Sequence, residues 1–380
     1  MKICDMQVLV VGNPWKNWIF LRLLTDEGIE GVGEATSGLE TMPVVAHLEE
    51  LRELVIGKDP RSLPMLLEDI RKALFLGRGR EAVSGIEIAC WDIIGKISGL
   101  PLYQLLGGKC RGAVRVYANG WYQGPRDPVF LAESAKKLTE QGYTALKFDP
   151  FGKAYQFMTR DEERFSMKLV EAVRNAVGDS VDIMIEAHDR FCLSQAIRTG
   201  KMLEEYDPFW YETPVNSSSL KDVSEVARRV NIPVIAGERQ SDPRELARFL
   251  AEGAVDFINP ELMGIGGVSG LLDCFAIARG FGASVAPHNA QSPFCTAVNV
   301  HIGVSQPNLL IQECFDDSAV DWASNVLEGF PRVENGMIRP SEAPGIGVSV
   351  NWEAAKRYPY GSRNFLRLFD EGWEKRNGAQ

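Results

Sequence analysis

Six ionisable residues stand at the ends of short apolar runs in the second half of the chain, 23 to 27 residues apart. They are Glu186, Glu212, Glu238, Glu261, His288 and Glu313. That spacing is about the length of one strand and one helix in a parallel α/β fold. Because the carboxyl ends of parallel strands meet at one edge, and neighbouring strands lie about 4.8 Å apart, we expect these side chains to converge.

Three of these carboxylates, Glu186, Glu212 and Glu238, follow consecutive apolar runs. One glutamate at the end of a buried strand is ordinary, since such a strand has to end in a polar residue. Three in succession would repel each other and lose solvation unless a cation lay between them. An all-oxygen site without cysteine or clustered histidine favours Mg²⁺, or Mn²⁺, over Zn²⁺. The three glutamates therefore predict a divalent metal site.

Two of the four histidines follow apolar runs that end near the predicted metal site. His188 lies two residues beyond Glu186, and His288 ends a later run, so we expect both imidazoles to face the cation. His47 and His301 fall inside helical periodicity, where a structural histidine is the better interpretation. Among the histidines, a functional role is therefore assigned to His188 and His288.

Lys147 and Asp149 alternate at the end of an earlier apolar run, so both side chains are predicted to face the same side of the chain. A buried lysine is rare without a function. Lys147 is therefore predicted to contact a substrate, and Asp149 is predicted to share that contact.

The elements that must position these residues recur from Val114 onward, as an apolar run, a polar residue, a loop and an amphipathic helix. The eight runs cover residues 114–118, 145–148, 182–185, 209–211, 233–236, 255–258, 283–286 and 309–312. Strands that alternate with helices imply a parallel sheet, and eight such strands imply a closed barrel of the TIM type. In the predicted helix 161–177, apolar residues share one face and Gly178 supplies the stop.

The two ends of the chain depart from this repeat. Residues 1–112 predict a separate α+β unit, with strand-like runs at 6–10 and 18–24 and helical periodicity at 47–56, 63–74 and 82–97. Residues 113–320 form the predicted barrel. Residues 321–380 return to short irregular elements.

Composition limits the classes of partner. The 380 residues are 45% hydrophobic and 24% charged, as in an average globular protein, and the net charge of −10 disfavours nucleic acid and anionic membranes. The first residues do not match a signal peptide, and prolines interrupt the longest uncharged stretch, so no membrane helix is expected. Seven scattered cysteines without a CxxC pair favour reduced thiols and a cytoplasmic location.

Seven motifs follow one another along the chain. They are SGIEIACWDIIGK at 84–96, PLYQLLGG at 101–108, YETPV at 211–215, IAGER at 235–239, NPELMGIGG at 259–267, APH at 286–288 and QE at 312–313. Together they resemble the mandelate racemase and muconate lactonizing enzyme branch of the enolase superfamily over essentially the whole chain. The resemblance implies an α+β capping domain, built from both chain ends, over a modified (β/α)7β barrel. It also implies Mg²⁺ on Glu186, Glu212 and Glu238, and a homo-oligomer is expected.

The resemblance also assigns roles to single residues. His288 resembles the base that removes the proton next to a carboxylate, with Glu261 in place of its usual Asp partner. Glu313 resembles the acid that shares charge with a substrate carboxylate oxygen. Lys147 matches the first lysine of the family's Lys-x-Lys motif, and Asp149 replaces the second.

The replacement of the second lysine by Asp149 favours some reactions of the family over others. Racemisation and cycloisomerisation need the base that Asp149 displaces, whereas β-elimination needs one base for the C2 proton and one acid for the C3 hydroxyl. His188, in the motif EAH, is placed like the leaving-group acid of galactonate, gluconate and mannonate dehydratases, although Glu186 stands where those enzymes mostly have Asp. The resemblance therefore implies a Mg²⁺-dependent dehydratase of an aldonate or aldarate that forms a 2-keto-3-deoxy acid. An epimerase or racemase, a cycloisomerase and a catalytically silent homologue remain as alternatives.

Four further residues are predicted to contact the substrate. Trp15 falls in the first mobile loop of the family's capping domain, and Arg78 stands just before an apolar helix. Arg239 and Asn289 each adjoin a stronger candidate. All four carry groups that can pack against or hydrogen-bond an acid sugar.

Overall fold

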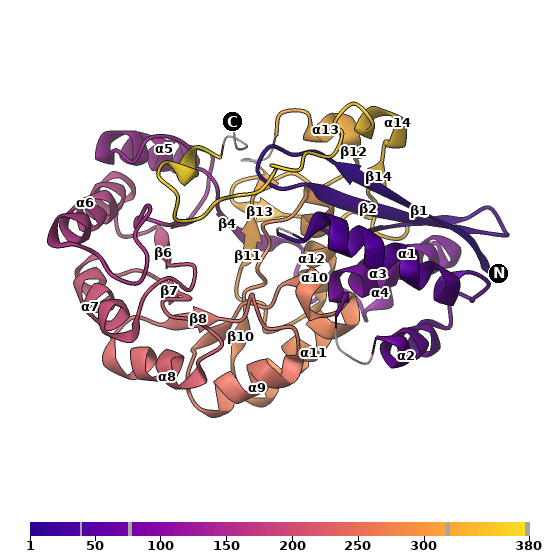
Figure 1. Ribbon diagram of the computed structural model, residues 1–380, viewed down its shortest axis with the longest axis horizontal. Helices are drawn as coiled ribbons and strands as arrows, with labels where there is room; N and C mark the ends of the chain where they lie inside the picture. Colours follow the sequence, from indigo (N-terminus) through magenta and orange to yellow (C-terminus); the bar gives the residue numbers. More distant parts are fainter. Residues whose placement is uncertain (39, 75–77, 317–319, 377–380) are drawn as a thin grey trace.

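The computed structural model describes residues 1–380 except 39, 75–77, 317–319 and 377–380. Its N-terminal part is an antiparallel sheet covered by helices, drawn in indigo and purple in Figure 1. The strands, in sheet order, are β1 (Ile3–Val11), β2 (Trp18–Thr25) and β3 (Glu30–Glu34). The helices are α1 (Thr41–Val55), α2 (Leu63–Ala73), α3 (Arg80–Ser98) and α4 (Leu102–Leu105). The predicted α+β unit is present.

Glycines in β3 let α3 approach the sheet closely. A Cβ on Gly33 would lie 2.0 Å from the carbonyl oxygen of Gly85, and one on Gly31 would lie 2.1 Å from that of Ala89. Any larger residue would therefore force α3 away from β3. The sheet and α1–α3 share one hydrophobic cluster, so this unit has a core of its own.

Eight parallel strands follow. They are β4 (Val114–Ala118), β5 (Ala145–Phe148), β6 (Asp182–Glu186), β7 (Trp210–Glu212), β8 (Val234–Ala236), β9 (Phe257–Ile258), β10 (Ser284–Val285) and β11 (Gln312–Cys314). They pair in the order β10-β9-β8-β7-β6-β5-β4-β11, and a parallel bridge between Val285 and Leu309 joins the two ends of that path. The predicted closed barrel is confirmed. The last strand was placed too early, because Leu309 makes only this bridge and regular pairing with β4 begins at Gln312.

The helices α5 to α9 lie around the outside of the barrel in Figure 1. The helices of the barrel are α5 (Pro128–Glu140), α6 (Arg160–Val177), α7 (Leu193–Leu203), α8 (Leu220–Arg229), α9 (Pro243–Ala251), α10 (Leu262–Ile265), α11 (Gly267–Gly280) and α12 (Pro293–Ser305), with a 3₁₀ turn η1 (Glu204–Tyr206). The helix predicted at 161–177 begins one residue earlier, where Thr159 and Glu162 form a capping box, and it ends before Gly178.

The C-terminal residues contact both parts of the molecule. Their elements are α13 (Ala323–Val326), β12 (Leu327–Glu328), β13 (Met337–Ile338), β14 (Ser349–Val350), α14 (Trp352–Ala355) and the 3₁₀ turn η3 (Trp373–Lys375). A bridge joins Phe365 to Lys16 in the N-terminal unit, and β13 pairs with β4 of the barrel. In Figure 1 the yellow end of the chain runs from beside the N-terminal unit toward α5. The division at residues 112 and 320 stays a prediction.

No helix in the described part of the chain is long and apolar enough to cross a membrane.

Candidate active site at the carboxyl ends of the barrel strands

Side chains alternate between the two faces of each strand, and this alternation explains why most candidate site residues point into the barrel. The inner core of the barrel is a cluster contributed by most of the strands, namely Tyr117, Ala145, Met184, Trp210, Ile235, Ala286 and Ile311. Five of these inward residues are followed, two positions later, by a candidate site residue. These are Lys147, Glu186, Glu212, His288 and Glu313. Successive side chains of a strand alternate between faces, so these five also point inward, above the core. Glu238 departs from this period, because Gly237, with φ of +149°, turns the chain after β8.

Glu186, Glu212 and Glu238 form the predicted cluster, with one carboxylate oxygen of each within 4.8 Å of the others. Glu186 and Glu212 are paired in register across β6 and β7. The Glu186 carboxylate accepts a hydrogen bond from Thr213 at 2.7 Å. Glu212 accepts bonds from Trp210 Nε1 at 2.9 Å and from Asn259 at 2.8 Å. Neighbouring donors therefore fix the two carboxylates before any ion arrives.

Lys147 supplies one positive charge to this cluster. Its Nζ lies 3.1 Å from Glu186, 2.8 Å from Glu212 and 3.0 Å from Glu313, and the side chain is buried. Burial lowers the pKa of the ammonium, but the three carboxylates raise that pKa well above its usual range. Burial and the Glu186 charge raise the pKa of Glu212. One ammonium does not neutralise the buried glutamates, so a divalent cation suits this set of oxygen donors.

Glu313 completes the carboxylate cluster, which we define as Glu186, Glu212, Glu238 and Glu313. It accepts hydrogen bonds from Asn119 Nδ2 at 2.6 Å and from the backbone N–H of Asn289 at 2.7 Å. Burial raises its pKa, but Lys147, His288 and these two donors outweigh burial and lower the pKa to about 2. Glu313 is therefore ionised in the absence of substrate.

His288 faces the carboxylate cluster without the partner that the sequence predicted. Its Nε2 lies 3.4 Å from Glu238 and 3.8 Å from Glu313, and its Nδ1 has no hydrogen-bond partner among the described residues. The expected contact with the Glu261 carboxylate was wrong. That carboxylate instead accepts the backbone N–H of Met263 at 3.2 Å, at the start of α10, and Gln291 Nε2 at 3.1 Å. Glu261 and His288 are joined only through their backbones.

His188 contacts Asp149, a residue that the sequence analysis predicted to contact the substrate. Its Nδ1 lies 2.6 Å from Asp149, whose carboxylate also pairs with Arg190, and the His188 backbone N–H donates to Glu186 at 2.7 Å. Asp149 was predicted to contact substrate, but it is buried beneath His188 and orients that ring. Burial lowers the pKa of His188, whereas Glu186 and Asp149 raise it more, so the pKa lies above its ordinary value.

One cavity of about 380 Å³ brings most of the predicted residues together. Its lining includes Lys147, Glu186, His188, Glu238, Arg239, Glu261 and His288. Arg239 is half-exposed at the rim, where it pairs with Asp189 at 2.8 Å. Above the strand ends the same cavity is lined by Trp15, Lys16, Phe365, Leu366, Trp373 and Arg376, a set that we call the roof. Trp15 therefore lies where its prediction put it.

Besides Asp149, two predicted substrate contacts do not line this cavity. The side chain of Asn289 is fully buried and donates to Thr296 at 2.7 Å, so only its backbone serves the site, through Glu313. Arg78 lines a different hollow, of about 320 Å³, together with Arg71 and Arg244. Neither side chain lines this cavity, because adjacency along the chain does not bring a side chain to a neighbour's cavity, and the two substrate contacts stay predictions.

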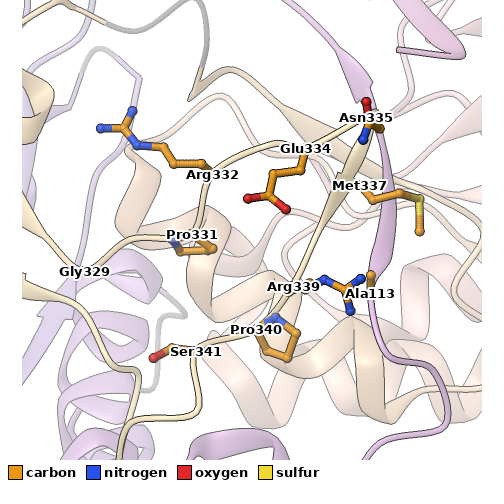
Figure 2. A pocket seen from close by; sticks show the side chains of 10 residues that line it. All are labelled: Ala113, Gly329, Pro331, Arg332, Glu334, Asn335, Met337, Arg339, Pro340 and Ser341. Carbon is orange, nitrogen blue, oxygen red and sulfur yellow. The ribbon is translucent and has the colours of Figure 1, made fainter. Parts of the chain in front are cut away.

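A further hollow, of about 470 Å³, lies where β4 begins, and Figure 2 shows the side chains that line it. It is lined by residues between Gly329 and Ser341, together with Ala113, which precedes β4. The site residues follow the other ends of the strands, so this hollow is separate from the carboxylate cluster.

Sequence reasoning missed three residues of the site. Arg190 follows His188 by two positions and holds Asp149, so the charged run after the EAH motif could have indicated it. Trp373 packs edge-on against His188, with ring centroids 5.8 Å apart, and Arg376 lines the roof. Neither of these has a local signal, because each reaches the site from the far end of the chain.

Family models match most of the chain. The model described as mandelate racemase / muconate lactonizing enzyme, N-terminal domain, matches residues 6–107, and the model described as enolase C-terminal domain-like matches residues 130–355. A D-gluconate dehydratase of Thermoproteus tenax is 37% identical over 90% of this chain and 70% of that protein. A D-gluconate/D-galactonate dehydratase of Picrophilus torridus is 33% identical over 95% of this chain and 93% of that protein.

Solved structures agree with these relatives. A mandelate racemase/muconate lactonizing enzyme-like protein from a Roseovarius species superposes with a TM-score of 0.89 and 32% identity, over 98% of each chain. With the two family models, the named relatives and the barrel geometry in agreement, the chain belongs to the enolase superfamily, in its mandelate racemase and muconate lactonizing enzyme branch.

Proposed function

We propose that the protein is a Mg²⁺-dependent dehydratase of a sugar acid, an aldonate or aldarate, and forms a 2-keto-3-deoxy acid. The observation that carries this proposal is the presence of two imidazoles in one cavity with the carboxylate cluster. Removal of the C2 proton and departure of the C3 hydroxyl need two proton-transfer groups, and His288 and His188 supply them. The relatives named as sugar-acid dehydratases support the same reaction.

His288 is the proposed base. Its Nε2 faces Glu238 and Glu313, and it therefore stands beside the place where a substrate carboxylate would meet the metal ligands. A divalent cation held by Glu186, Glu212 and Glu238 would stabilise negative charge on that carboxylate as the C2 proton leaves. Lys147 adds a fixed ammonium to the same region. These groups act where charge develops, which is the main source of rate enhancement at such sites.

His188 is the proposed acid for the leaving hydroxyl. Asp149 holds Nδ1, so Nε2 is the atom free to deliver a proton. The raised pKa of His188 favours the protonated ring that this role requires. The predicted acid role of Glu313 fits less well, because its lowered pKa keeps it ionised until substrate brings further negative charge.

Racemase, epimerase and cycloisomerase activities are less well supported. Asp149 replaces the second lysine of the family's Lys-x-Lys motif, the base that these reactions need. The Asp149 carboxylate is buried against His188 and Arg190. A silent homologue would not need this complete set of metal ligands, base and acid.

Isotope exchange tests the proposal directly. Purified protein supplied with Mg²⁺ should convert at least one acid of an aldonate and aldarate panel to a 2-keto acid. In D₂O, His288→Asn should stop both product formation and deuterium incorporation at C2. His188→Asn should slow product by roughly 10² to 10⁴-fold, yet still exchange the C2 proton. No 2-keto acid from any member of the panel would contradict the proposal.

The cellular setting belongs to the same proposal. All seven cysteines are free thiols, which supports the reducing cytoplasm. The proposed partner is a small sugar acid, and the proposed assembly is a homo-oligomer. Nucleic acid and membrane surfaces are not proposed as partners, in keeping with the net charge of −10.

A further inference from the structure

Arg376 is a buried cation without a matching anion. The side chain is 4% exposed, and its Nε and Nη1 have no hydrogen-bond partner among the described residues. Three aromatic rings surround the guanidinium, with centroids 5.4 Å away at Trp15, 5.1 Å at Tyr122 and 4.7 Å at Phe315. Aromatic faces offset part of the cost of burying a cation, and Tyr122 takes one side-chain hydrogen bond from Arg376, but Nε and Nη1 stay without a partner among the described residues.

The fold makes room for this guanidinium. Gly120 has φ of +82°, and a Cβ there would lie 2.4 Å from Arg376 Nη1 and 2.6 Å from the Phe315 ring, so glycine leaves room for the guanidinium. Burial lowers the pKa of Arg376, with Tyr122 and Glu313 opposing that shift, but a guanidinium keeps its charge. The site therefore holds a fixed positive charge at the wall of the cavity.

Lys16 is a second cation of the roof. Its Nζ lies 5.5 Å from the centroid of Trp15, the ring that Arg376 also covers, and 3.4 Å from Gln291 Oε1. Burial lowers its pKa, while Glu261, Glu313 and Glu238 oppose that shift from a distance. Within the described residues, neither Lys16 nor Arg376 forms an ion pair.

Arg376 lies across the barrel from the predicted metal ligands, whereas Lys16 lies beside Gln291, which follows β10. Glu186 and Glu212 end β6 and β7, and Glu238 follows β8, whereas Arg376 contacts residues that follow β4 and β11. Lys16 comes from the loop between β1 and β2. A substrate whose reacting carboxylate meets the carboxylate cluster through a cation would therefore present its other end to Lys16 and Arg376.

We infer that Lys16 and Arg376 bind a second anionic group, at the end of the sugar chain opposite the reacting carboxylate. The preferred substrate is then a sugar diacid, or a sugar acid phosphorylated at its far end, in place of a sugar mono-acid. This inference rests on the proposed function and narrows it. The relatives described above carry the names of mono-acids, so the second anion would separate this chain from them.

A matched set of D-gluco acids tests the inference: gluconate, glucarate and 6-phosphogluconate, with galactonate and galactarate as a second pair. Two readouts are taken on Mg²⁺-supplied protein, the rise in unfolding temperature on ligand addition and kcat/KM for 2-keto acid formation. A dianionic acid should give the larger rise and a kcat/KM at least about 10-fold above that of its mono-acid, as expected for one charge-assisted hydrogen-bonded pair. Preference for glucarate identifies a carboxylate, and preference for 6-phosphogluconate identifies a phosphate.

Variants connect this preference to the two cations. Arg376→Gln should lower kcat/KM for the preferred dianion on the order of 10²-fold, and by a clearly smaller factor for gluconate. Arg376→Lys should recover part of the loss, because it keeps the charge. Lys16→Gln should give a loss in the same direction and provides an independent test if Arg376→Gln does not fold. Arg367→Gln is the matched control, since Arg367 is an exposed arginine of the same C-terminal segment.

Three results would overturn the inference. Turnover of gluconate or galactonate equal to that of the dianions would do so while leaving the proposed dehydratase intact. Equal losses for mono-acid and dianion in Arg376→Gln would make Arg376 a structural residue. Binding and turnover of none of the five acids would remove both the inference and the proposed function. Arg376-dependent binding of a dianion without 2-keto product would support the inference and contradict dehydration.

Discussion

The carboxylate cluster and the roof of the same cavity carry opposite charge and are built in opposite ways. The cluster places four glutamates on strand ends of one barrel, so each is fixed by the sheet and by neighbouring donors. The roof joins Trp15 and Lys16 to Arg376, residues from opposite ends of the chain. The cluster therefore supplies chemistry common to any substrate with a suitable carboxylate, whereas the roof is suited to select what lies at the other end of that substrate.

The largest effect is expected where the cluster loses charge. Glu212→Gln removes one buried negative charge from the proposed metal site and should lower kcat at least about 10²-fold for every sugar acid that the protein accepts. Chelation of divalent cations followed by Mg²⁺ return should abolish and restore activity in the wild type. Rates for mono-acids and dianions, compared side by side, should fall by the same factor. Full activity after complete chelation would contradict a catalytic role for a divalent cation at the carboxylate cluster.

The next effect tests whether Asp149 orients His188. Asp149→Asn keeps the size of the side chain but replaces the acceptor that holds Nδ1, so it should favour the wrong tautomer of His188. Dehydration should slow about 10²-fold, whereas deuterium exchange at C2, which depends on His288, should continue. Unfolding temperatures should be compared as well, because Asp149 also pairs with Arg190. Equal losses of exchange and dehydration would assign Asp149 a general structural role.

The same contrast explains how much could be predicted from sequence. The barrel, the N-terminal unit and the convergence of Glu186, Glu212 and Glu238 follow from spacing and alternation, which are local properties of strands. The partner of His288 could not be predicted this way, because the Glu261 carboxylate has a choice between the imidazole and the N-terminus of α10. Arg376 was also missed, since no spacing rule connects the C-terminal residues to strand ends.

A smaller effect is expected at the seam between the capping sheet and the barrel. Glu34, at the end of β3, accepts hydrogen bonds from Ser292 at the start of α12, and burial raises its pKa to about 7. The folded state then holds a proton that the unfolded chain releases near its ordinary value of 4.5. Stability from this group is therefore present below about pH 4.5 and is lost as pH rises through 7.

Glu34→Gln, which mimics the protonated form, should remove this dependence. The difference between variant and wild type in the free energy of unfolding should grow by a few kcal/mol in favour of the variant between pH 4.5 and 8. Urea unfolding at a series of pH values measures it. A constant difference across that range would mean that Glu34 has the same pKa in the folded and unfolded states, and would contradict the raised pKa.

The smallest effect is expected at Arg78, a cation of the N-terminal unit that does not line the active-site cavity. It is exposed and lines the separate hollow near Arg71 and Arg244, so it offers no charge to a ligand beside the carboxylate cluster. Arg78→Gln should change kcat/KM by less than about 2-fold for mono-acids and dianions alike, as for an ordinary surface substitution. The comparison with Lys16→Gln is informative, because both variants remove one positive charge from the same unit and leave the net charge equal. A loss of dianion selectivity in Arg78→Gln as large as that in Lys16→Gln would mean that selectivity follows the overall field of the capping unit. A loss confined to Lys16→Gln would mean that direct contact in the roof sets it.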